Sequence, residues 1–561
     1  MADEFLSGDT VITSVNSKGI LHVETQSIHL LLYVTILFAF ALYLASLKNV
    51  QVGVSDDDAH YIVASEALAG GYGYVLINYP IPRKEILWPP GYPIFLIPFT
   101  TWYLGQYTIL QVMSIVLTII WLSLSFLWFR RTSGALIASL SFLLVAFNPQ
   151  IVGVATQVKS EALFLVLLFS TFLFLEKGIS TDDKPWVIWL LLAVFCAVLA
   201  TAVRSIGLVI ILTIPIVAIL FRRWRRTLIT IAFILLTYLP LAMFLIQNGG
   251  TFIAPTRANQ SQIFWTSNPI ELIQHAVANL QIYAVKFLLP VLTAVFGPNG
   301  LALAERNQVF NLFLMGINLL LIGLVILGVY QFIKVGVNGQ NRLNTIITIV
   351  FSSLYLGVLL IFRDGNVRGY HAQIRYLIPL LPFLMTWMLW GVLTVLLTVP
   401  WPAQISKFTR HTGFSLSLIV LLFLSAYIGR DFLNIYKPNQ SQIPDISAGA
   451  DWIKEMTPQS AIIACDDPVP RYLYLDRKTV RYQTADTVEK TFSEFEMQPD
   501  YLLIAPRLRV GNEGRLDSDQ EELIDLLQSR PKYELVHKNE DLNVYIFEDT
   551  RKNEQIEFYH P

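Results

Sequence analysis

Charged residues are scarce in this 561-residue chain. Asp, Glu, Lys and Arg together make up 14% of it, whereas an ordinary soluble protein contains roughly 25%. Hydrophobic residues account for 54%. The net charge of −1 lacks the basic excess of nucleic-acid-binding proteins, so we predict no nucleic-acid partner. A chain this poor in charge is expected to have the lipid bilayer as its main solvent.

Cysteine and targeting signals are equally sparse. Cys196 lies in an apolar run and Cys465 in a polar region, so no disulfide framework is predicted. No pattern typical of a cleavable signal peptide opens the chain. Its first apolar run follows the polar segment 1–27 and is long enough to be a permanent span. We also find no internal repeat and no low-complexity segment.

Long apolar runs, by contrast, are abundant. A membrane-spanning helix needs roughly 20 predominantly apolar residues. Eleven runs approach that length and predict about eleven spans: 28–47, 107–129, 134–149, 161–176, 186–203, 206–221, 227–246, 309–333, 343–362, 375–399 and 413–429. Two shorter, proline-containing runs, 92–104 and 283–297, are predicted to dip into the membrane or lie at its interface.

Lys and Arg at the ends of these runs predict the orientation in the plasma membrane. The cluster FRRWRR at 221–226 is the strongest cytoplasmic signal. Alternation from that point places segment 1–27 in the cytoplasm. It places the loop 48–106 and the tail 431–561 on the exoplasmic side of a transmembrane domain at 28–430. This alternation requires that 283–297 does not cross fully.

The tail itself alternates short strand-like and helix-like stretches, among them AIIAC, DYLLIA, EELIDLLQ and NVYIFED. Such alternation predicts a small α/β domain. The fold class expected from the whole sequence is therefore a mainly α, polytopic membrane protein with a small C-terminal exoplasmic α/β domain.

The stretch VSDDDAHYIVASEALAGG at 54–71 contains three consecutive aspartates beside the first span. A structural interpretation is that Ser55 and Asp58 cap a helix that Gly70 and Gly71 end. A functional interpretation is that Asp57, His60 and Tyr61, three and four residues apart, share one helix face and meet a polar ligand. An ionised Asp57 would then suit proton abstraction from an attacking hydroxyl.

Five motifs in this order resemble the GT-C fold glycosyltransferases that use polyprenyl-phosphate sugars. This group includes the protein O-mannosyltransferases and aminoarabinose transferases and is related to glycosyltransferase family 39. Residues 57–61 fit its acidic-acidic-x-x-Tyr motif, with Asp58 where the family usually has Glu. The other four are Pro89-Pro90-Gly91-Tyr92-Pro93, KSEALFLVLL (159–168), VRSIGLVIIL (203–212) and IRYLIPLLPFL (374–384). Together they cover most of residues 28–430.

The resemblance implies transfer of a sugar from a polyprenyl-phosphate donor to an acceptor hydroxyl, by inverting displacement on the exoplasmic side. It implies that Asp57, Asp58 and Glu161 are catalytic. Cations at the predicted outer ends of spans support an anionic ligand there, because they run against the usual inside bias: Lys159, Arg204, Lys286, Arg363, Arg368 and Arg375. The expected substrate-binding residues are His60, Tyr61, Tyr92, Lys159, Arg204, Arg375 and Tyr376.

Several alternatives stay open at this point. Asp57, His60 and Glu161 are candidate ligands for a divalent metal, and the sequence leaves metal dependence undecided. A lipid or glycan transporter, a hydrolase or ligase of the same fold, and a non-catalytic glycan-assembly subunit remain alternatives. The acceptor can be a protein, a lipid or a polysaccharide, and neither the sugar nor the polyprenyl chain can be identified.

Overall fold

A computed structural model describes residues 25–47, 51–54, 57–85, 87–103, 105–181, 185–248, 268–283, 292, 307–339, 341–362, 375–398, 412–436, 445–482, 499–506 and 516–550. The chain divides into two compact units. The first, which we call the membrane unit, comprises residues 1–46, 112–156 and 160–433. The second, the loop–tail unit, comprises residues 47–111, 157–159 and 434–561.

Helices make up the described part of the membrane unit. In chain order they are α1 (Thr25–Ser46), α4 (Tyr107–Ser133, which begins in the loop–tail unit), α5 (Ala135–Ala146), α6 (Pro149–Ala155), α7 (Ser160–Ser180), α8 (Trp186–Val203), the 3₁₀-helix η3 (Ser205–Gly207), α9 (Leu208–Leu220), α10 (Trp224–Gln247), α12 (Pro269–Ile282), α15 (Gln308–Asn338), α16 (Arg342–Phe362), the 3₁₀-helix η5 (Arg375–Leu380), α18 (Leu381–Thr398) and α20 (Thr412–Tyr436).

All eleven predicted runs are helical in the part of the chain that the structure describes. Eight helices there are long and apolar enough to cross a membrane. The pair α5 and α6, bent by 64°, forms a ninth candidate, and the apolar helices at Leu32–Ser46 and Ser205–Leu220 are shorter. Helices suit a bilayer because they satisfy their own backbone hydrogen bonds. The prediction of an integral, multi-pass membrane protein is confirmed.

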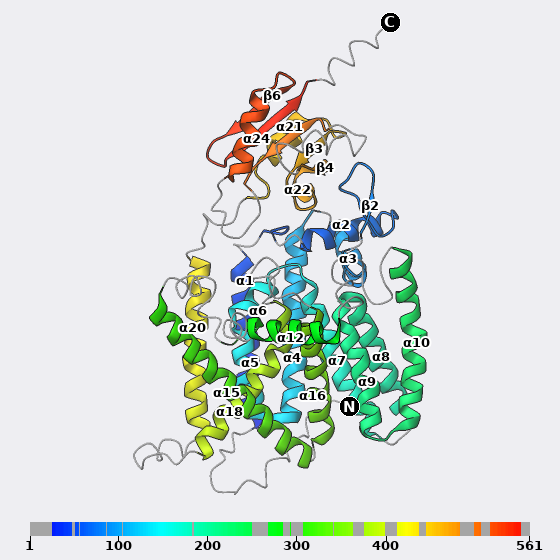
Figure 1. Cartoon of the computed structure of the whole chain (residues 1–561), viewed down its shortest axis with the longest axis vertical. Helices are drawn as coiled ribbons and strands as arrows, with labels where there is room; N and C mark the ends of the chain where they lie inside the picture. Colours follow the sequence, from blue (N-terminus) through cyan, green and yellow to red (C-terminus); the bar gives the residue numbers. More distant parts are fainter. Residues whose placement is uncertain are drawn as a thin grey trace. The chain divides into compact units, whose positions relative to one another are not determined.

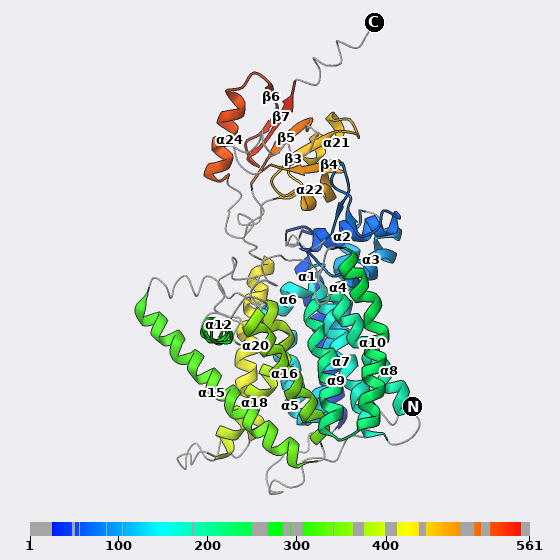
Figure 2. The ribbon, with the colours of Figure 1, turned by 45° about the vertical axis from the view of Figure 1, so that its right-hand side comes forward.

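Close packing of α15 against α18 depends on glycine. A Cβ added at Gly328 would lie 1.7 Å from the carbonyl oxygen of Trp387, and one at Gly391 would lie 2.0 Å from that of Leu324. Small residues allow membrane helices to approach backbone to backbone. Helix α12, in contrast, runs across the other helices of this unit (Figures 1 and 2) and exposes an apolar stripe that includes Ile273 and Val277.

The loop–tail unit contains a five-stranded mixed sheet in the order β4-β3-β5-β7-β6. Its strands are β3 (Ile462–Cys465), β4 (Lys478–Arg481), β5 (Tyr501–Ile504), β6 (Tyr533–Asn539) and β7 (Val544–Asp549), and its helices are α21 (Ala450–Met456), α22 (Pro468–Leu475) and α24 (Ser518–Gln528). Strand β3 is parallel to β4 and β5, whereas β7 is antiparallel to β5 and β6. The predicted small α/β domain is confirmed.

The same unit also contains the first long loop. This loop forms α2 (Asp57–Ala69), the short strands β1 (Val75–Leu76) and β2 (Arg83–Lys84), and α3 (Gly91–Trp102). Helix α3 contains residues 92–102 of the predicted dipping segment 92–104, and its 12 residues rise only about 18 Å, too little to cross a bilayer core of about 30 Å. The other such segment, 283–297, lies outside the described residues except for Tyr283 and Leu292.

Hydrogen bonds join this loop to the C-terminal sheet. The Thr479 amide donates to the Asn78 carbonyl at 2.7 Å, and the Asn78 side-chain amide donates to the Thr479 hydroxyl at 3.2 Å. The Lys478 ammonium donates to the Ile77 carbonyl at 2.6 Å. The sequence-based division assigned loop 48–106 to the transmembrane domain. By its packing the loop belongs with the tail, because its polar backbone finds partners there.

Candidate functional site

A cluster of two arginines and one glutamate forms in the membrane unit, and we call it the arginine cluster. Glu161 lies in the first turn of α7. Arg204 ends α8 in an extended conformation (φ −148°, ψ 128°) before the turn η3, and Arg375 is the first residue of η5. All three therefore lie at helix ends, where a charged side chain interrupts an otherwise apolar segment.

Glu161 bridges the two arginines through one oxygen. Its Oε1 lies 2.7 Å from Nη1 of Arg204 and 3.5 Å from Nε of Arg375. The glutamate side chain is 2% exposed, and those of Arg204 and Arg375 are 11% and 12% exposed. The carboxylate is thus enclosed, while each arginine side chain keeps a small exposed part.

Two neighbours hold the arginines in place. Arg204 Nη1 also donates to the Ser160 hydroxyl at 3.1 Å. The Tyr376 ring centroid lies 5.7 Å from Cζ of Arg204 and 5.5 Å from Cζ of Arg375, within the range of cation–π attraction. The Tyr355 hydroxyl donates to the backbone carbonyl of Tyr376 at 2.9 Å and fixes the start of η5.

The arginine cluster places two guanidinium groups beside one carboxylate. Arginine forks match the oxygens of a phosphate, which they bind through paired hydrogen bonds. The geometry of this cluster therefore suits an anionic ligand of phosphate type.

A second group of predicted residues lies on α2 in the loop–tail unit, where the three residues of the motif have different environments. Asp58 is 1% exposed. Its Oδ2 accepts from the Gly53 amide at 2.8 Å, and its Oδ1 accepts from the Ala59 amide at 3.0 Å. A carboxylate bound this way orders the turn that leads into α2. Asp57 is 9% exposed and begins the helix. The predicted cap Ser55 lies outside the described residues.

His60 pairs with a residue that sequence reasoning did not single out. Its Nδ1 lies 2.8 Å from Oε2 of Glu85, and Oε1 of Glu85 accepts from the Leu87 amide at 2.6 Å. Glu85 is only 2% exposed. A buried carboxylate of this kind fixes the orientation of an imidazole ring. The sequence does not predict the contact between Glu85 and His60. Glu85 follows two basic residues in a hairpin, 25 positions after His60, and no helix or strand spacing relates the two.

Aromatic rings surround Tyr61. Its ring centroid lies 4.9 Å from that of Tyr92 in an edge-on arrangement and 5.7 Å from that of Trp88. Both partners come from the proline-rich return at 88–93, and the Trp88 carbonyl accepts from the Tyr74 hydroxyl at 2.8 Å. The rings pack α2 against α3 and so support the position of the helix that bears Asp57.

Glu66, on the same helix, gives a testable pH dependence. Burial, and next the negative charge of Asp476, raise the pKa of Glu66 from 4.5 to about 7. The folded protein then binds a proton that the unfolded chain releases, so stability is greatest below pH 4.5 and falls as the pH rises through 7. Glu66→Gln should remove this loss, which we expect to be roughly 2–3 kcal/mol at pH 8. Thermal unfolding of the full chain at pH 4.5 and pH 8 checks it. Parallel curves for wild type and variant at both pH values would contradict it.

The remaining predicted residues divide by unit. Glu161, Arg204, Arg375 and Tyr376 come together in the membrane unit, and Asp57, Asp58, His60, Tyr61 and Tyr92 lie together in the loop–tail unit. Lys159 is half-buried and belongs to the loop–tail unit. Lys286, Arg363 and Arg368 lie outside the described residues. In the described ranges, no three His, Cys, Asp or Glu side chains are close enough together to hold a metal ion, the candidates Asp57, His60 and Glu161 included.

Three residues that contact these groups belong to none of the predicted site residues: Glu85, Ser160 and Tyr355. Ser160 stands inside the quoted stretch KSEALFLVLL, but hydroxyl side chains are common at helix starts and carry little signal. Tyr355 lies in the middle of the apolar helix α16, where a tyrosine usually serves only to pack against neighbouring helices. An intramembrane hydroxyl that reaches a backbone carbonyl is recognised only from the folded structure.

Comparisons with known proteins identify the fold of the chain. No family model and no curated protein sequence matches the chain. Among solved structures, ArnT from Cupriavidus metallidurans bound to undecaprenyl phosphate matches with a TM-score of 0.52 and 13% identity, over 94% of this chain and 99% of that one. Its apo state matches with a TM-score of 0.54 and 13% identity, over 94% and 98%.

An archaeal protein matches as well. The oligosaccharyltransferase AglB from Archaeoglobus fulgidus, in complex with an inhibitory peptide and a dolichol-phosphate, has a TM-score of 0.53 and 11% identity, over 85% of this chain and 69% of that one. At such identities the likeness concerns the architecture. The chain has the GT-C fold that its five motifs predicted.

Proposed function

We propose that this protein is a membrane glycosyltransferase that moves a sugar from a polyprenyl-phosphate donor to an acceptor hydroxyl on the exoplasmic side. The observation that carries the proposal is the arginine cluster, in which Arg204 and Arg375 lie beside the same carboxylate oxygen of Glu161. Two solved structures of the same fold contain a polyprenyl phosphate, undecaprenyl phosphate in ArnT and dolichol-phosphate in AglB, which supports a lipid phosphate as the anion.

The proposed step is a single displacement. The acceptor oxygen attacks the anomeric carbon while Asp57 accepts the hydroxyl proton. The bond between that carbon and the phosphate oxygen breaks, and the electron pair leaves with the polyprenyl phosphate. Arg204 and Arg375 stabilise the negative charge that develops on this leaving group. One displacement at one carbon inverts its configuration.

The other residues support these groups. Glu161 aligns the two guanidinium groups, and Tyr376 packs beside both. Asp58 orders the start of α2, while the pair of His60 and Glu85 and the rings around Tyr61 fix the helix. Lys159 and Tyr92 remain proposed substrate contacts. We assign no step to a metal ion.

Purified full-length protein in lipid nanodiscs tests the activity. We expect wild type to consume at least one polyprenyl-phosphate sugar from a panel of radiolabelled donors and to release free polyprenyl phosphate with an acceptor extract. Cells that carry wild type or Asp57→Asn are then compared for glycolipids, glycoproteins and surface polysaccharide, and the fraction that loses a sugar identifies the acceptor class. Labelled lipid that crosses the bilayer without sugar transfer would instead indicate a flippase, and unchanged glycans in a full deletion would refute the proposal.

A further inference from the structure

We infer that the C-terminal domain binds a neutral saccharide in a groove between α24 and β7, which we call the α24–β7 groove. This inference rests on the proposed function and deepens it, because it names glycan as the acceptor class. The groove has a volume of about 630 Å³, within the range of roughly 300–1,000 Å³ typical of ligand pockets. Six residues line it: Leu516, Glu521, Ile524, Asp525, Asn543 and Tyr545.

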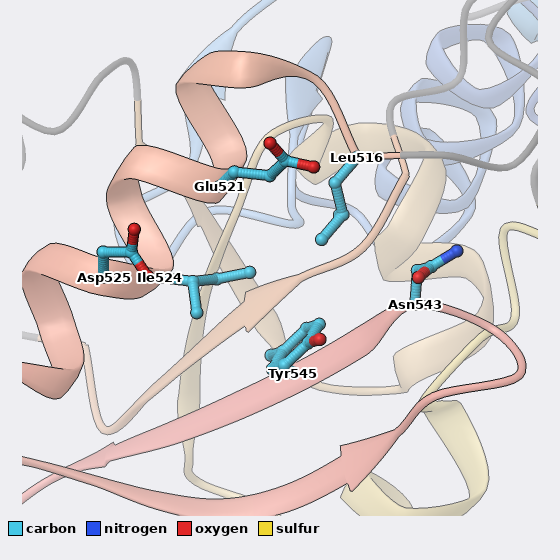
Figure 3. A pocket seen from close by; sticks show the side chains of 6 residues that line it. All are labelled: Leu516, Glu521, Ile524, Asp525, Asn543 and Tyr545. Atoms are coloured by element: carbon cyan, nitrogen blue, oxygen red, sulfur yellow. The ribbon is translucent and has the colours of Figure 1, made fainter.

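The lining combines one aromatic ring with three polar side chains. Figure 3 shows the Tyr545 ring on β7, with Ile524 projecting from α24 and Leu516 from the segment just before α24. Glu521 and Asp525 stand four residues apart on α24, so they occupy one face of the helix. Asn543 lies just before β7, on the far side of the groove from Asp525.

This combination fits the surface of a sugar. A pyranose ring presents an apolar C–H face, which packs on an aromatic side chain, and a rim of hydroxyls. Ionised carboxylates accept short hydrogen bonds from hydroxyls, and an amide both donates and accepts. Glu521 and Asp525 are exposed, so both carboxylates are hydrated in the free protein and can accept hydrogen bonds from a ligand's hydroxyls.

A cationic ligand is the main alternative for two carboxylates beside an aromatic ring. Positive charge is already present there, however. The Lys538 ammonium lies 5.6 Å from the Tyr545 ring centroid and is hydrogen-bonded to Glu540 at 2.6 Å. Lys538 is thus already placed near this ring, where a cationic ligand would otherwise lie. The aromatic ring and the hydrogen-bonding side chains, and not the net charge, are the features that fit a neutral saccharide.

The place of the groove in the fold gives it a role. It lies in the loop–tail unit, the compact unit that also contains α2 and Asp57. Because Asn78, Lys478 and Thr479 bond the first loop to the sheet, a glycan held by this domain is held by the unit that bears the proposed base. A chain of several sugars can occupy such a groove while its terminal hydroxyl is presented elsewhere.

Binding of defined probes tests the inference independently of catalysis. Maltotriose, mannotriose and chitotriose are titrated against the full chain in nanodiscs, with saturation-transfer NMR to detect contact. We expect at least one of them to bind at millimolar concentration or better. Tyr545→Ala should weaken that binding about tenfold or more, since a lost aromatic anchor typically costs that much, whereas Tyr545→Phe keeps the ring and should stay within about threefold.

Matched variants on α24 separate the groove from the domain as a whole. Glu521→Gln and Asp525→Asn should each weaken binding, while Glu522→Gln, an exposed neighbour that does not line the groove, should leave it unchanged. These exposed positions remain informative if Tyr545→Ala does not fold. Absence of binding by folded wild type, insensitivity to all three groove variants, or binding of trilysine in place of the sugars would overturn the inference. The assay of donor consumption in nanodiscs tests the proposed function separately, so a negative binding result would leave that proposal intact.

Discussion

Asp57→Asn is expected to lower the turnover of the donor by roughly 10²- to 10⁴-fold, the usual contribution of a general base. Asparagine has nearly the same shape as aspartate and still accepts a hydrogen bond, but it cannot take up the hydroxyl proton. The variant should therefore bind donor and acceptor almost as wild type does and lose only the chemical step. Initial rates of polyprenyl phosphate release, measured with saturating donor, check the expected loss.

Two carboxylates on the same helix serve as controls. Glu66→Gln makes the same chemical change 9 residues along α2, at a position outside the proposed site, and should retain wild-type turnover at pH 7. Asp58→Asn places an amide where two backbone N–H groups donate, so we expect it to lose roughly 1–3 kcal/mol of stability while its folded fraction stays active. Wild-type turnover in folded Asp57→Asn would remove Asp57 from the mechanism and make His60 the next candidate base.

The membrane helices and the strands of the tail could be predicted from the sequence because local hydrophobic patterns encode them. Apolar runs of about 20 residues leave a chain few alternatives to helices in a bilayer. The stretch AIIAC contains β3, and EELIDLLQ lies within α24, since the periods of hydrophobicity differ between strands and helices. In the part of the chain that the structure describes, the bend between α5 and α6 and the shorter apolar segments Leu32–Ser46 and Ser205–Leu220 depart from regular full-length spans.

Associations between distant residues could not be predicted in the same way. The bond from Thr479 to Asn78 joins positions 401 residues apart, and neither residue type is unusual in a loop. The pairing of His60 with Glu85 depends on a hairpin whose strands are two residues long. Family motifs brought Glu161, Arg204 and Arg375 to attention, but only coordinates show that a single carboxylate oxygen lies beside both arginines.

The second large effect is expected from Arg204→Gln. Glutamine keeps two donors and much of the side-chain length but has no charge, so the cluster loses one of its two positive charges. Loss of one group that stabilises developing negative charge typically costs about 10²–10³-fold in turnover. Affinity for polyprenyl phosphate, the released product, should fall in the same variant, because the interaction is with the phosphate and not with the sugar.

Arg131→Gln is a matched control at the other end of α7. Arg131 of α4 pairs with Glu176 near the last turn of α7, whereas Arg204 pairs with Glu161 in its first turn. Both changes break one Arg–Glu pair on α7, so any general loss of stability should be similar. Only Arg204→Gln should reduce affinity for polyprenyl phosphate, measured by its inhibition of donor turnover.

Glu161→Gln separates charge from alignment at the arginine cluster. Neutralising the carboxylate removes one negative charge beside the two guanidinium groups, which by charge alone should tighten binding of polyprenyl phosphate. The same change replaces the carboxylate beside the two guanidinium groups with a neutral amide that holds them less firmly, so turnover should fall although the phosphate is held more tightly. Tighter product binding with slower turnover would mark Glu161 as the residue that positions the arginines. Weaker binding in both Glu161→Gln and Arg204→Gln would mean that the cluster is a structural ion pair and that the donor phosphate binds elsewhere.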